Sequence, residues 1–151
     1  MVCHGLLLGY RDGEHRRVVR GWRFWCSDRG RRRGCGKTFS VLWSWALRCC
    51  TVSANLLWLF VSAVGEGKTV KAGWEMVSGK LSLRTGYRLW GRLLRVQSWV
   101  RQLLLREKPP PASEHRRAEF ELIDHLGAVF EAAACPICEF QHRLQRNFLG
   151  P

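Results

Sequence analysis

Carboxylate side chains are scarce in this sequence. Only 12 of its 151 residues are Asp or Glu, against 25 Lys and Arg, and just three are aspartates, Asp12, Asp28 and Asp124. Strand-transfer catalysis needs several separated carboxylates to hold metal ions, carried on a larger mixed sheet. No nucleophile stands at a suitable spacing from a base either. The sequence therefore predicts no catalytic residue.

Long apolar runs are missing as well. The longest stretch without a charge, residues 49–65, has 17 residues and contains Thr51, Ser53 and Asn55. A membrane-spanning helix needs about 20 predominantly apolar residues, so we expect a buried helix here and no membrane span. The leucine run at 6–8 is too short for a secretory signal. We therefore expect a cytoplasmic protein.

Positive charge is abundant and unevenly placed. The formal net charge is +13, and 20 of the 25 basic residues are Arg. Residues 1–48 carry 11 basic and 3 acidic side chains, residues 49–108 carry 10 and 3, and residues 109–151 carry 4 and 6. A basic block of this kind favours a polyanionic partner.

The chain divides into three segments. Residues 1–45 are rich in Arg and Gly, and the stretches 18–25 and 38–43 have the composition of two short partner strands. Residues 51–107 have helical periodicity, and residues 112–151 hold one further amphipathic helix. We expect a mainly α protein, with a small basic β-ribbon followed by a helix-turn-helix region and a C-terminal helix.

Hydroxyl side chains mark the expected helix starts. Ser53, Thr69 and Ser82 each precede an apolar periodic stretch, as N-cap residues do. The helix after Ser82 can continue to residue 107, where the three prolines at 109–111 stop it. Ser113 is the expected cap of the C-terminal helix.

The helix that follows Ser82 has two different faces. An apolar stripe recurs at helical spacing, and a row of arginines lies about 105° away from it around the axis. The apolar stripe predicts packing, within the chain or against a second copy in a homodimer, through Leu89, Leu93, Val96, Val100 and Leu103.

Residues 68–92 fit a helix-turn-helix, in which a short helix, a turn containing Gly79 and a capped basic helix follow one another. Side chains at the start of such a second helix reach base edges in the major groove of double-stranded DNA. An ordinary basic helical hairpin is the alternative. The DNA-reading hypothesis assigns Ser82, Arg84, Thr85, Tyr87, Arg88 and Arg92.

The densest basic cluster lies between two aromatic stretches in the N-terminal segment. Neutralising DNA phosphates is its expected use, and a solvated loop is the alternative. The predicted phosphate-binding residues are Arg29, Arg31, Arg32, Arg33 and Lys37.

Seven cysteines in a chain without a secretory signal favour metal binding over disulfides. Cys26 and Cys35 flank the basic cluster, whose charges lower thiol pKa values and so favour metallation. Cys135 and Cys138 have ligand spacing by themselves, although plain structural thiols or a redox pair are alternatives. A tetrahedral zinc ion needs four ligands. The two pairs are the predicted set, with Cys3, His4 and His142 as further candidates.

The N-terminal residues resemble a known family. The stretch 24–40, with its Cys pair, Arg cluster and ending Cys35-Gly36-Lys37-Thr38-Phe39-Ser40, looks like the second knuckle of the N-terminal zinc ribbon of bacterial insertion-sequence transposases. Residues 82–90 are similar to the recognition helix after such ribbons. The resemblance covers roughly residues 1–105 and implies a zinc ribbon, bound zinc and binding of transposon DNA, with nucleoid association. The first knuckle pattern and the catalytic domain of that family are absent from this sequence.

Other classes of function stay open at the level of the sequence. A compact transposase or nuclease would use the few carboxylates. A peripheral membrane protein would use the Trp-rich stretch 43–60. An open reading frame without a selected function is a further alternative.

Overall fold

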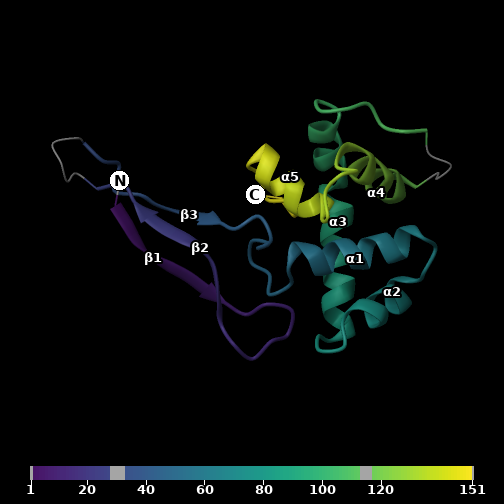
Figure 1. Ribbon diagram of the computed structural model, residues 1–151, viewed down its shortest axis with the longest axis horizontal. Helices are drawn as coiled ribbons and strands as arrows, with labels where there is room; N and C mark the ends of the chain where they lie inside the picture. Colours follow the sequence, from purple (N-terminus) through teal and green to yellow (C-terminus); the bar gives the residue numbers. More distant parts are fainter. Residues whose placement is uncertain (1, 28–32, 113–116, 151) are drawn as a thin grey trace.

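The computed structural model describes residues 2–27, 33–112 and 117–150 (Figure 1). The described part of the chain is 45% helical and 16% strand. Its elements in chain order are β1 (Val2–Gly9), β2 (Val18–Trp25), β3 (Thr38–Leu42), α1 (Ala54–Gly65), α2 (Val70–Val77), α3 (Leu83–Leu104), α4 (Ala118–Val129) and α5 (Pro136–Leu144).

The expectation of a mainly α protein with a zinc ribbon is wrong. The strands form one antiparallel sheet in the order β1-β2-β3, so the fold is a mixture of α and β structure. The sequence does not predict β1, because its three consecutive leucines show no period-two alternation. In the structure, β1 pairs with β2 along its length. A third strand therefore widens the expected ribbon into a sheet.

The sheet presents an apolar face to solvent. Register places Leu6 beside Trp22 and Trp22 beside Val41, so these side chains share one face. Phe24 pairs with Phe39 in the same register, and their rings stack with centroids 5.4 Å apart. Leu6, Trp22 and Val41 keep 38–48% of their surface exposed. Cross-strand aromatic contacts, rather than a covering helix, therefore stabilise this face.

Helices α1, α2 and α3 begin where the hydroxyl residues predict. Ser53 is the N-cap of α1 and accepts a hydrogen bond from the N–H of Leu56 at 3.1 Å. Thr69 does the same for Ala72 at the start of α2, at 3.2 Å. Ser82 is the N-cap residue of α3, although its hydroxyl lies 3.3 Å from that of Thr85 instead of capping the backbone.

A row of buried aromatic rings joins four of the helices. Phe60 of α1 meets Trp74 of α2 edge to face at 5.2 Å, and Trp90 of α3 at 6.2 Å. Trp90 in turn lies 6.3 Å from Phe120 of α4. The helices after the prolines at 109–111 thus share one hydrophobic core with the helices before them, and the C-terminal segment is part of the helical body.

The apolar stripe of α3 lies inside that core. Leu93 and Val100 have no exposed surface, and Leu89 has 3%, while Val96 and Leu103 pack against the core from its margin. The homodimer expected through these five residues would have to compete with the core of the chain itself. We therefore do not retain this stripe as a surface for a second copy.

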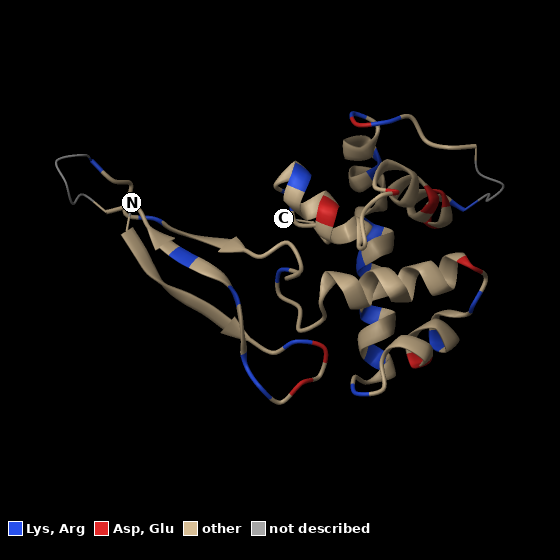
Figure 2. Cartoon of the chain, viewed as in Figure 1, with Lys and Arg blue, Asp and Glu red and all other residues tan. Residues whose placement is uncertain are grey.

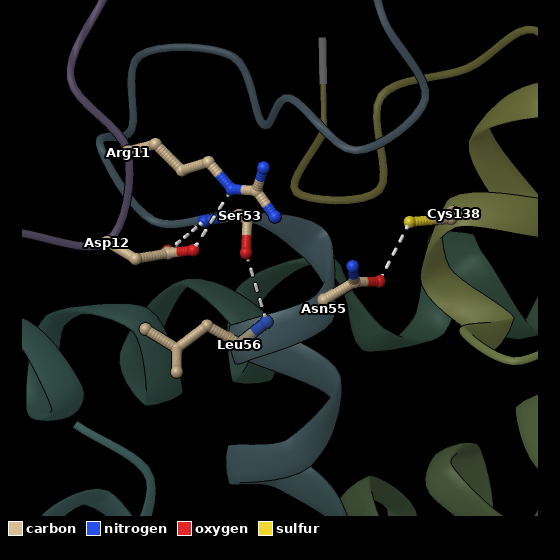
Figure 3. A network of polar contacts seen from close by, with 6 residues as sticks. All are labelled: Arg11, Asp12, Ser53, Asn55, Leu56 and Cys138. Atoms are coloured by element: carbon tan, nitrogen blue, oxygen red, sulfur yellow. Dashed lines mark hydrogen bonds and ion pairs between the residues drawn. The ribbon is translucent and has the colours of Figure 1, made fainter. Parts of the chain in front are cut away.

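A few polar contacts hold the sheet and the helical body together (Figure 3). Asp12, in the turn after β1, accepts a hydrogen bond from the N–H of Ser53 at 2.7 Å, and its own N–H donates to the carbonyl of Thr51 at 2.8 Å. The guanidinium of Arg20 donates to the carbonyl of Leu47 at 2.7 Å. The N-terminal end of α1 is thereby held against the β1–β2 loop.

Every helix within residues 2–27, 33–112 and 117–150 is too short or too polar to cross a bilayer. Residues 49–65, for which a buried helix is expected, fold into α1 and the turns before it. Six of the twelve residues of α1 are buried.

Replacing Gly86 by Ala tests the α2–α3 junction. A Cβ at Gly86 would stand 2.6 Å from Cγ of Trp74, so we expect Gly86→Ala to lower the free energy of unfolding by about 1–3 kcal/mol. Gly91→Ala, on the same helix, would meet only the Arg95 guanidinium at 3.8 Å and should raise it by up to about 1 kcal/mol. Chemical denaturation followed by circular dichroism measures both. Equal effects of the two substitutions would contradict the packing described here.

Candidate nucleic-acid interface

The turn between α2 and α3 is fixed by one indole. The ring of Trp74 is 1% exposed, and its Nε1–H donates to the carbonyl of Ser82 at 3.1 Å, with the carbonyl of Leu81 at 3.4 Å. The same ring covers Gly86, where no side chain larger than hydrogen fits. Because these contacts hold both ends of the turn, the first turns of α3 have a defined orientation relative to α2.

The outward face of these first turns is basic. Arg84, Tyr87 and Arg88 are exposed, Tyr87 by 52%, and their spacing of three and four places them on one side of the helix. The buried side carries Leu89 and Trp90. In the described part of the chain, neither Arg84 nor Arg88 has a carboxylate within ion-pair distance. Both guanidinium groups are therefore available to an external anion.

Of the other residues assigned to DNA, Arg92 is used within the chain. Its Nη1–H donates to Sγ of Cys50 at 2.9 Å, and the pair is partly buried. Burial raises the pKa of the Cys50 thiol, and the nearby Arg92 acts in the opposite direction. Arg92 thus anchors α3 to the loop before α1. It lies one helical turn after Arg88 along α3. Thr85 is half-buried and Ser82 exposed.

The described residues of the N-terminal basic cluster lie at the end of the molecule opposite the start of α3. Arg29, Arg31 and Arg32 fall outside the described residues, whereas Arg33 and Lys37 are exposed. Cys26 closes the base of this loop, because its N–H donates to the carbonyl of Lys37 and its carbonyl accepts from the N–H of Gly36, both at 3.0 Å. Figure 1 shows the end of β2 and the start of β3, which flank this loop, on the side of the sheet furthest from the helices. The two predicted DNA-binding clusters therefore form separate surfaces.

The two cysteine pairs also stay apart. The N–H of Cys35 lies 3.4 Å from Sγ of Cys26 at the tip of the sheet, and Cys135 and Cys138 begin α5 in the helical body. Among the described residues, no three His, Cys, Asp or Glu side chains are grouped so that they could hold a metal ion. The candidates Cys3, His4 and His142 are exposed and join neither pair. Zinc therefore stays a prediction from the sequence.

Sequence reasoning missed a second basic surface. A groove of about 750 Å³ lies between the stretch that follows β3 and the end of α5. Trp43, Arg48 and Arg146 are among the residues that line it. No local pattern joins residues so far apart along the chain. No signal in the sequence singles out Arg146, which follows Arg143 and stands between Gln145 and Asn147.

No protein family, no curated protein and no solved structure matches this chain. The resemblance to transposase N-terminal regions is therefore untested by comparison.

The thiol of Cys135 should titrate near neutral pH. Hydrogen bonds from the Cys138 thiol, and from the N–H groups of Cys138 and Ile137, lower the pKa of Cys135 to about 7, against partial burial, which raises it. The same thiol–thiol bond and burial raise the pKa of Cys138. We therefore expect thiolate absorbance to rise between about pH 6 and pH 8, since Cys135 deprotonates as the pH passes its pKa.

The assignment is checked with two single variants. Cys135→Ser should remove the absorbance step, and Cys35→Ser, which changes an exposed cysteine, should leave it in place. A step that persists in Cys135→Ser would show that another thiol titrates there.

Proposed function

We propose that this protein binds double-stranded DNA, with the first turns of α3 in the major groove. The observation that carries the proposal is the pair of exposed guanidinium groups, Arg84 and Arg88, on the outward face of a helix that Trp74 holds in place. A helix fits the major groove, and Arg forms two hydrogen bonds to the edge of guanine. Tyr87, between the two arginines, adds a hydroxyl that can reach phosphate or base.

The surroundings of this face add positive charge. Lys80 is exposed in the α2–α3 turn. The β1–β2 loop lies directly against that turn, because a Cβ at Gly13 would stand 2.7 Å from Cβ of Lys80. This loop carries the exposed Arg16 and Arg17 together with the exposed Glu14, and Figure 2 shows both basic and acidic residues in it. Lys and Arg beside a reading helix neutralise phosphates and set its register on the duplex.

The local field at the start of α3 suits a polyanion. The first turn of α3 holds no acidic residue, and the N-terminus of a helix carries partial positive charge. The acidic residues nearest in sequence, Glu66 and Glu75, belong to the turn before α2 and to α2 itself, where each lies within 4.0 Å of a lysine. The β1–β2 loop adds Asp12 and the exposed Glu14 against Arg11, Arg16 and Arg17, so carboxylates are present on this side of the molecule but basic residues outnumber them there.

The double variant Arg84→Ala with Arg88→Ala tests the proposal. Each well-placed Arg contact is worth about 1–3 kcal/mol, so we expect affinity for a mixed-sequence duplex to fall at least about tenfold. Fluorescence anisotropy of a labelled duplex at low salt measures it. Selection of binding sites from a random duplex pool should also give a weaker sequence preference for the variant.

A charge-matched control separates the site from net charge. Arg23→Ala with Arg106→Ala removes two exposed arginines from the sheet and from the segment after α3, and affinity should change less than about threefold. If both double variants lose affinity equally, binding reflects total charge alone and the assignment to α3 is wrong.

A further inference from the structure

The groove between the sheet and α5 is lined by segments that one buried side chain joins. Gln141 spans its floor: Nε2–H donates to the carbonyl of Ser44 at 2.6 Å, and Oε1 accepts from the N–H of Phe148 at 3.0 Å. Gln141 is itself 9% exposed. The segment after β3, the helix α5 and the C-terminal turn are therefore joined through one side chain.

The chemistry of its lining favours an anion that carries a ring. No Asp or Glu lines the groove, whereas two arginines do, Arg48 and Arg146. Both are exposed, and in the described part of the chain neither forms an ion pair. Trp43 also lines it and is 45% exposed. Hydroxyl and amide groups of Ser40 and Gln145 supply further hydrogen bonds.

We propose that this groove binds nucleotide units of single-stranded nucleic acid, with a base stacked on Trp43 and its phosphates held by Arg48 and Arg146. Stacking on an exposed aromatic ring between cationic groups is how proteins hold single strands without base pairing. A volume of about 750 Å³ suits ligands of small-molecule size and admits no duplex. The site is thus distinct from the outward face of α3.

The test uses a fluorescein-labelled oligothymidylate and the whole chain. Loss of a base–aromatic stack is expected to weaken binding about tenfold, so Trp43→Ala should raise the Kd by that factor, and Arg146→Ala should raise it and flatten its dependence on salt. The matched controls are Trp22→Ala, on the exposed face of the sheet, and Arg106→Ala, and both should leave the Kd nearly unchanged. Circular dichroism of each variant establishes that it is folded.

Two further arms distinguish the sources of binding. Thymidine monophosphate should compete with the labelled strand at millimolar but not micromolar concentration, because a strand uses several phosphates at once. The variant Arg84→Ala with Arg88→Ala should lose duplex binding and keep strand binding, and Trp43→Ala should do the reverse. If the α3 double variant keeps duplex binding while the strand results are as expected, the proposed function is wrong and the proposal for the groove still holds.

Other outcomes overturn the groove. If Trp43→Ala and Trp22→Ala weaken strand binding equally, the strand lies on the sheet face. If the α3 double variant loses strand and duplex binding by the same factor, one surface binds both. Lack of any affinity for the strand at low salt would also reject the proposal.

Discussion

The contact between Trp74 and Gly86 decides which side of α3 faces solvent. The indole fills the space at the α2–α3 junction, and its N–H satisfies a carbonyl of the turn, so burial and hydrogen bonding act on the same group. Phe60 meets the other edge of the ring. With the apolar stripe committed to the core, the helix has only its basic side left for a partner. The proposed reading face is thus a consequence of packing, and disturbing the junction would move Arg84 and Arg88 together.

Much of the local structure could be predicted from the sequence, and most long-range relations could not. Ser53, Thr69 and Ser82 precede helices as expected, because capping is local: the hydroxyls of Ser53 and Thr69 accept a hydrogen bond from the N–H three residues further on, and Ser82 occupies the N-cap position without that bond. The strand β1 escaped prediction, since its pairing with β2, and not any alternation, makes it a strand. Arg92 has the same helical spacing as Arg88, yet Cys50, 42 residues earlier, determines its role. Helical periodicity therefore predicts which residues share one face of a helix, but not which part of the chain contacts that face.

The same limit applies to the cysteines and to the groove. The local turns that bring each cysteine pair together are readable from spacing, and the distance between the pairs is not. The groove residues Trp43 and Arg146 come from segments that Gln141 joins, a buried amide whose two hydrogen bonds reach the carbonyl of Ser44 and the N–H of Phe148. A glutamine on a short helix gives no sequence signal of such a role, because its partners are backbone groups.

Excess positive charge by itself does not define a binding site in this protein. Several arginines bind groups of the chain itself. Arg20 donates to a backbone carbonyl, Arg101 pairs with Glu121 and Arg143 pairs with Glu107, each within 2.8 Å. An arginine held in this way has already exchanged its hydration for a partner in the chain and gains less from an external phosphate. Two sets in the described part of the chain differ from these because they combine exposed guanidinium groups with an aromatic neighbour on a rigid support. One set surrounds Tyr87 on α3 and the other surrounds Trp43 in the groove. The first set lies on the outward side of a helix, as the proposed duplex-binding face requires, and the second lines a groove, as the proposed strand-binding site requires.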